Sequence, residues 1–149
     1  MVELEVYFKN DPKTSYLLLI GEGVFLSAFF DSVSVLLENG KSGERFPFLM
    51  KEFYYGKIPY EHLDNLEAEL DIVKNEFKKI SADKVVWDLG DEFHQLPAER
   101  LIKSGAQNLC DYFLTTDNLS LFYIFHRAIE LAKGACSSIY IRSTMIEMK

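Results

Sequence analysis

The chain begins with alternating apolar and polar side chains. Over residues 2–8 every second side chain is apolar, which is the period of a half-buried strand. Asn10, Asp11 and Pro12 are typical of a turn, because Asn and Asp bond their own backbone and Pro presets φ. A second apolar run, residues 16–20, ends at Gly21. We therefore predict an antiparallel hairpin at the start of the chain.

From Val24 the apolar residues recur at spacings of three and four, which is typical of helices with one buried face. The pattern predicts a helix that stops at Asn39 and Gly40, a short helix within residues 45–56, and a long helix over residues 60–80. The long helix is the clearest, because one stripe holds its large apolar residues: Leu63, Leu66, Leu70, Val73, Phe77 and Ile80.

The second half of the chain is less regular. Residues 84–88 favour a strand or extended segment, residues 89–100 a loop, and residues 112–116 a strand. A helix is predicted over residues 120–133, ended by Gly134, and a final strand over residues 137–146. We therefore predict one α+β domain over residues 1–149, with an antiparallel sheet of about four to five strands packed with three to four helices.

The excess of acidic over basic residues lies in the middle third of the chain. The whole sequence has 16 Lys and Arg against 23 Asp and Glu, for a net charge of −7. Eleven acids and four bases lie in residues 61–99, whereas the rest of the chain has twelve of each. An acidic chain lacks the basic surface that binds nucleic acid, so we expect no direct nucleic-acid partner.

The sequence also lacks the marks of a membrane or secreted protein. No apolar run approaches the roughly 18 residues that cross a bilayer. The N-terminus is acidic and alternating, unlike a signal peptide, so we expect a cytoplasmic protein with no membrane partner. Cys110 and Cys136 are then expected to be thiols and small buried hydrophobic residues.

Catalytic motifs are weak. The three histidines lie far apart, and Gly21 and Gly23 lack the later residues of a phosphate-binding loop. We therefore predict no catalytic residues, no metal and no cofactor. One alternative is a metal-dependent hydrolase, because hard oxygen ligands and an imidazole lie close together at Asp88, Asp91, Glu92 and His94. Another is a regulatory homodimer that pairs an exposed sheet edge such as the final strand.

One block carries a specific resemblance. Its pattern is Arg45-Phe46-Pro47-x-Leu49-Met50-x-Glu52-x-Tyr54-x-Gly56-Lys57. With Val86-Trp87-Asp88 and Asp111-Tyr112-Phe113 downstream, the sequence resembles the immunity protein 70 family. Within this block we expect Phe46, Leu49, Met50 and Phe53 to pack in the core and Gly56 to cap the helix.

The resemblance implies a non-enzymatic inhibitor. Members of such families are cytosolic bacterial proteins that bind and neutralise the toxic C-terminal domain of a cognate polymorphic toxin. A localised acidic surface would suit a basic toxin domain such as a nuclease. The predicted toxin-binding residues lie in one polar sector of the long helix and in the loop after it: Glu61, Asp64, Glu67, Asp71, Trp87, Asp88, Asp91 and Glu92. Trp87 fits either the core or the interface.

Overall fold

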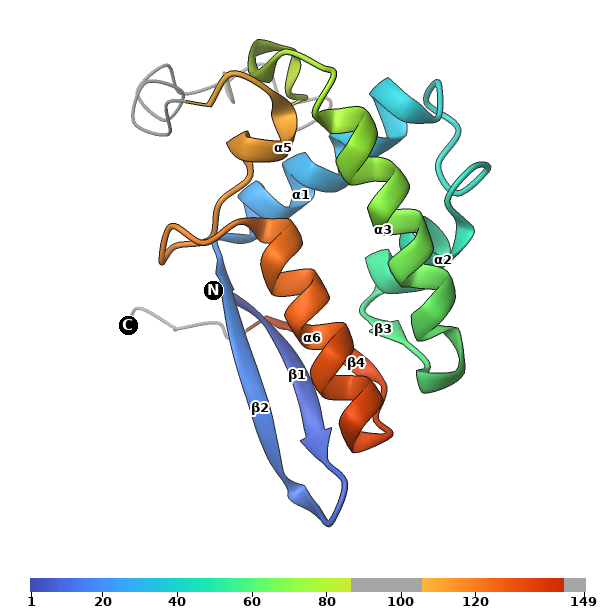
Figure 1. Cartoon of the computed structure of the whole chain (residues 1–149), viewed down its shortest axis with the longest axis vertical. Coiled ribbons are helices and arrows are strands. Elements are labelled where there is room, and N and C mark those ends of the chain that lie inside the picture. Colours follow the sequence, from blue (N-terminus) through green and yellow to red (C-terminus); the bar gives the residue numbers. More distant parts are fainter. Residues whose placement is uncertain (87–105, 144–149) are drawn as a thin grey trace.

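The described strands form one antiparallel sheet in the order β2-β1-β4-β3 (Figure 1). The computed structural model describes residues 1–86 and 106–143. β1 (Val2–Phe8) lies between β2 (Asp11–Gly21) and β4 (Ile139–Ser143), and the short β3 (Lys57–Ile58) pairs with β4. The predicted N-terminal hairpin is confirmed, and β2 is longer than the apolar run suggested.

Helices cover the sheet on one side. α6 packs directly on β1, and α3 packs on α6 and α2 (Figure 1). In β1 the alternating Val2, Leu4 and Val6 are buried, as their period of two predicts. The described helical elements are α1 (Gly23–Ser32) with a π-helical turn (Val33–Leu37), α2 (Pro47–Lys51), 3₁₀ turns at Phe53–Tyr55, Tyr60–His62 and Ala82–Lys84, α3 (Leu63–Phe77), α5 (Leu109–Tyr112) and α6 (Leu121–Ala135). The chain is a single α+β domain, as predicted.

Phe29 is at the centre of the core. Its ring contacts other aromatic rings from α1, α3 and α6 and from the segment after α5, at centroid distances of 5.4–6.0 Å: Phe30, Phe77, Phe113, Phe122 and Phe125. Burial of each large apolar side chain is worth roughly 1.5–3 kcal/mol relative to exposure. The stripe on α3 is buried from Leu63 to Phe77, and this packing fixes which side of α3 faces solvent.

The strand predicted at residues 112–116 is wrong. α5 ends at Tyr112, and beyond it Leu114 forms only an isolated bridge with Ser120. A helix begins here because of a capping residue that precedes the segment, and the β-prone composition of residues 112–116 gives no sign of that cap. The side chain of Asn108 accepts a hydrogen bond from the backbone N–H of Asp111 at 3.0 Å, which starts a helical turn just before the β-prone residues.

The predicted end of the last helix is also wrong. α6 continues through Gly134 to Ala135 and ends at Cys136, which adopts the left-handed conformation (φ 51°). The backbone N–H of Ser137 then closes the helix on the carbonyl of Ala132 at 2.9 Å. Cys136 is exposed, contrary to expectation, whereas Cys110 is buried and burial raises the pKa of its thiol.

Two further expectations need correction. Lys84 belongs to a 3₁₀ turn rather than to an extended segment, because the backbone N–H of Lys84 bonds the carbonyl of Ser81 at 3.0 Å. The final strand is not a free sheet edge, since β4 pairs with β1 and with β3. β2 is an outer strand instead. Residues 144–146 of the predicted final strand lie outside the described residues.

Candidate functional site

The acidic residues predicted on the long helix lie on its outer side. Pro59 precedes the 3₁₀ turn Tyr60–His62, which leads into α3. Because the apolar stripe of α3 faces the core, residues three and four positions apart on the other sector share a surface. Asp64, Glu67 and Asp71 follow this spacing and lie beside α6.

These acids meet two basic side chains of α6. Lys133 Nζ lies 2.6 Å from Asp64 Oδ1 and 3.1 Å from Glu67 Oε1. His126 lies 3.1 Å from Asp71 Oδ1 and 3.6 Å from Glu67 Oε2. We call these five residues the α3–α6 ladder. It brings together three of the predicted site residues and joins two helices that are distant in sequence.

The acidic side chains of the ladder differ in solvent exposure. The Asp64 side chain is 87% exposed, whereas that of Glu67 is 36% exposed. Exposed ion pairs contribute about 0–1 kcal/mol to stability, because water screens them. Asp64 is therefore the ladder acid most accessible to a partner, and Glu67 is more closely tied to α6.

Glu61 and Asp64 line a shallow hollow of about 250 Å³ together with Tyr60, Leu63 and Lys133. We call it the acidic hollow. The pKa of the Tyr60 hydroxyl is raised, first by hydrogen bonding to the Cys136 side chain and then by further causes that include Asp64 and Glu61. Both carboxylates of the hollow thus lie close enough to act on the Tyr60 hydroxyl.

The other predicted site residues lie outside the described residues. They are Trp87, Asp88, Asp91 and Glu92, and the alternative hydrolase cluster from Asp88 to His94 falls in the same range. Among residues 1–86 and 106–143, no group of three or more His, Cys, Asp or Glu side chains is placed to hold a metal ion.

A second hollow lies on the other side of the Tyr60–His62 turn. Its volume is about 460 Å³, and its lining is Lys51, Glu52, Tyr55, Lys57, Pro59 and His62. We call it the lysine groove. Sequence reasoning missed it because residues 45–56 were interpreted as a packing block. The available signal was the pair Tyr54-Tyr55 at the end of that block, where two large aromatic residues precede Gly56 and Lys57.

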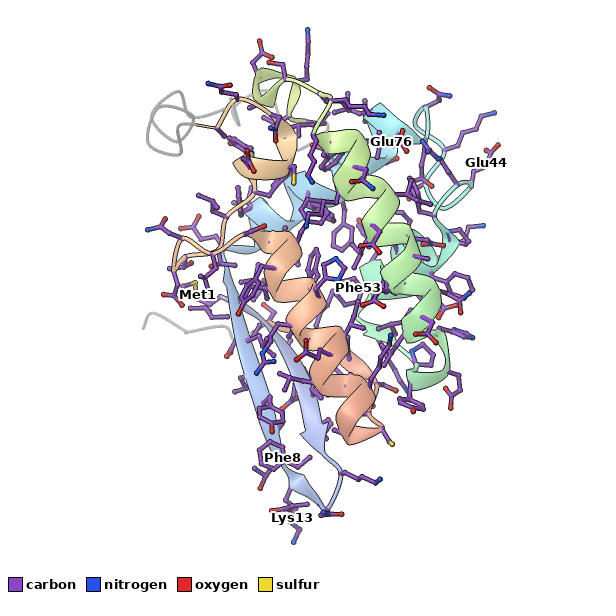
Figure 2. All side chains as sticks on the ribbon, viewed as in Figure 1. Met1, Phe8, Lys13, Glu44, Phe53 and Glu76 are labelled. Carbon is purple, nitrogen blue, oxygen red and sulfur yellow. The ribbon has the colours of Figure 1, made fainter. Side chains whose placement is uncertain are left out.

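The packing role of the same block is confirmed. Phe46, Leu49, Met50 and Phe53 are buried, and Figure 2 shows Phe53 in the interior of the molecule. Gly56 ends the 3₁₀ turn with φ 112°, a conformation that favours glycine. The block thus has a buried side that holds it in the core and an exposed side that forms the lysine groove.

Two carboxylates from other elements hold the start of this block. Glu38 Oε2 accepts hydrogen bonds from the backbone N–H groups of Gly43 (2.9 Å), Arg45 (3.0 Å) and Phe46 (3.0 Å). The Arg45 guanidinium in turn makes a two-pronged ion pair with the Glu76 carboxylate of α3. These contacts fix where α2 and the lysine groove lie relative to α3.

Comparison with known proteins identifies the family. The family model described as immunity protein 70 matches residues 8–141. Neither the comparison with curated proteins nor that with solved structures gave a match. In the described ranges, no helix is both long enough and apolar enough to cross a membrane. The family match covers both hollows and the ladder. The chain therefore belongs to the immunity protein 70 family.

Proposed function

We propose that this immunity protein binds the toxic C-terminal domain of a cognate bacterial toxin in the cytosol and neutralises it without chemistry of its own. Membership of the family supports a toxin partner. The proposed contact surface is acidic and comprises Glu61, Asp64, Glu67 and Asp71, together with Trp87, Asp88, Asp91 and Glu92.

One observation carries the choice of surface. Glu61 and the highly exposed Asp64 border an open hollow beside Tyr60, whose side chain is also exposed. Carboxylates beside an aromatic ring suit Lys and Arg side chains of a basic partner, and tyrosine is enriched at the centres of protein interfaces. Complementary charge also speeds association and disfavours wrong partners.

Neutralisation then needs only a stable complex. A specific interface covers about 800 Å² on each partner, which is enough to exclude a macromolecular substrate from the region it covers. If the toxin is a nuclease, its active site must be basic to hold a polyanion. The positive charge around such an active site would attract an acidic immunity protein as well as the nucleic acid. The immunity protein can therefore compete with the nucleic acid whether it covers the active site or binds beside it.

The test uses the cognate toxin domain, which under this proposal is encoded next to the gene for this chain. We expect co-expression of this chain to restore growth of bacteria that produce the toxin domain, and the two purified proteins to form a complex in size-exclusion chromatography. The control is Phe29→Asp, which places a charge in the aromatic core and should abolish folding and rescue together. Absence of both rescue and complex with the unsubstituted chain would refute the proposed function.

A further inference from the structure

We propose that the lysine groove binds an acidic segment of the same toxin domain, so that the interface carries both signs of charge. This inference rests on the proposed function and adds the chemistry of a second contact. It concerns residues on the opposite side of the Tyr60–His62 turn from the acidic hollow.

The two hollows are neighbours with different charge. Pro59 and His62 line the lysine groove, whereas Tyr60 and Glu61 line the acidic hollow. A 3₁₀ turn places residues three apart on the same side, which explains why Pro59 and His62 share the groove. A partner that covers this turn therefore meets two lysines and one carboxylate on one side, and two carboxylates and one lysine on the other.

The charge of the groove is not neutralised within the described chain. Glu52 also lies in the groove, where its Oε1 is 2.7 Å from His62 Nδ1, so the lining has two lysines and one carboxylate that contacts the imidazole. Within the described ranges, neither Lys51 nor Lys57 forms an ion pair. Two exposed lysines therefore have no carboxylate partner among residues 1–86 and 106–143, although the whole sequence has a net charge of −7.

The surroundings hold both lysines in place. The Lys57 ammonium lies 5.5 Å from the centroid of the Tyr140 ring, a cation–π distance. The aliphatic part of Lys51 lies against Gly43, where an added Cβ would come within 2.6 Å of it. Side chains that are already ordered lose less entropy when a partner binds.

Tyrosines form the rim beside the lysines. Tyr55 is 77% exposed, and its ring meets the Tyr54 ring edge-on at 5.1 Å. Tyr54 in turn contacts the ring of Phe30 at 5.0 Å, which anchors the pair to α1. Exposed tyrosines on a fixed base are typical of protein interfaces, where they add contact area at low entropic cost.

These features favour a polypeptide carboxylate over a nucleic-acid phosphate. A nucleic acid carries charge along its whole length and would meet the negative field of the chain beyond the groove. An Asp or Glu on a loop brings one or two charges, and the rest of a basic toxin domain can remain over the acidic hollow. The occupant we assign to the groove is therefore an acidic loop of the toxin domain.

The test compares two charge-reversal pairs with the same change in net charge. Lys51→Glu with Lys57→Glu alters the groove, and Lys9→Glu with Lys13→Glu alters the hairpin tip, where Figure 2 places Lys13. The probe is the purified toxin domain identified in the test of the proposed function, and thermal unfolding checks that both variants fold. We expect the groove pair to lose about tenfold or more in affinity and the hairpin pair to stay near the unsubstituted chain.

The outcomes separate this inference from the proposed function. Equal affinities for the two variants would overturn the groove contact while leaving toxin binding intact, whereas failure of the unsubstituted chain to bind would refute the function itself. A single-stranded RNA oligonucleotide provides the phosphate comparison. RNA binding that only the groove pair abolishes, with toxin affinity unchanged, would overturn the assignment to a polypeptide carboxylate.

Discussion

Glu69, in the middle of α3, accepts a hydrogen bond from the backbone N–H of Leu49 in α2 at 2.8 Å. The same carboxylate accepts a second, longer bond from Phe48 N–H at 3.3 Å. The residue before α2, Phe46, provides no side-chain cap. The Glu69 carboxylate, twenty residues further along the chain than Leu49, therefore replaces the missing N-cap and links α2 to α3.

The first prediction concerns this remote cap. Glu69→Ala leaves the N–H groups of Phe48 and Leu49 without their acceptor, so we expect a loss of about 1–2 kcal/mol in the free energy of unfolding. Urea denaturation at pH 7 measures it. Asn65→Ala, at an exposed position of the same helix, is the matched control and should change stability far less. Equal losses in the two variants would contradict the capping role.

The second prediction is a pH dependence. Burial raises the pKa of Glu69 above its usual 4.5, and Glu38 and Glu52 add to the shift, against the lowering effect of the Leu49 and Phe48 hydrogen bonds. Between 4.5 and this raised pKa, the folded chain binds more protons than the unfolded chain. The contribution of Glu69 to the free energy of unfolding therefore falls as pH rises through that window.

Glu69→Gln isolates this contribution. Its amide carbonyl can still accept from Leu49, but it does not titrate. Denaturation of both proteins from pH 4 to pH 8 should show a flatter dependence for the variant above pH 4.5. Identical slopes would mean that Glu69 titrates alike in the folded and unfolded chains.

The third prediction concerns Glu38, which is buried and bonds three backbone N–H groups in the loop before α2. Glu38→Ala leaves these groups unpaired, and we expect a loss of roughly 2–4 kcal/mol in stability. Glu44→Ala, on the same loop but exposed (Figure 2), should cost little. The comparison is made by thermal and urea unfolding, and a small loss for Glu38→Ala would show that water replaces the carboxylate.

The regular elements could be predicted because their own residues determine them. The stripe on α3 and the alternation in β1 each place apolar side chains on one side, and burial follows from that period. The wrong predictions concern segments whose secondary structure is determined by a capping contact or a backbone conformation that the periodic pattern does not show. Asn108 caps a helix in front of a β-prone segment, and the left-handed residue that ends α6 is Cys136 rather than Gly134.

The candidate site was predictable in part for the same reason. Helical spacing places Asp64, Glu67 and Asp71 together, and the structure confirms that arrangement. The spacing within α3 does not predict the contacts with Lys133 and His126, because these residues come from α6 and reach the acids only through tertiary packing. The lysine groove is harder still, since its position depends on how Glu38 and Glu69 hold the segment before and within α2.

The fourth prediction tests whether the location of charge, rather than its total, governs toxin binding. Glu61→Lys with Asp64→Lys reverses the acidic hollow, and Glu22→Lys with Glu44→Lys makes the same net change at exposed positions outside it. Long-range steering acts before contact, so stopped-flow measurements at low salt should show association slowed by about tenfold for the first pair. The deficit should shrink as salt rises, because the Debye length falls from roughly 30 Å at 0.01 M to about 8 Å at 0.15 M. If both pairs slow association equally at every salt concentration, net charge alone steers the encounter and the hollow has no special part in it.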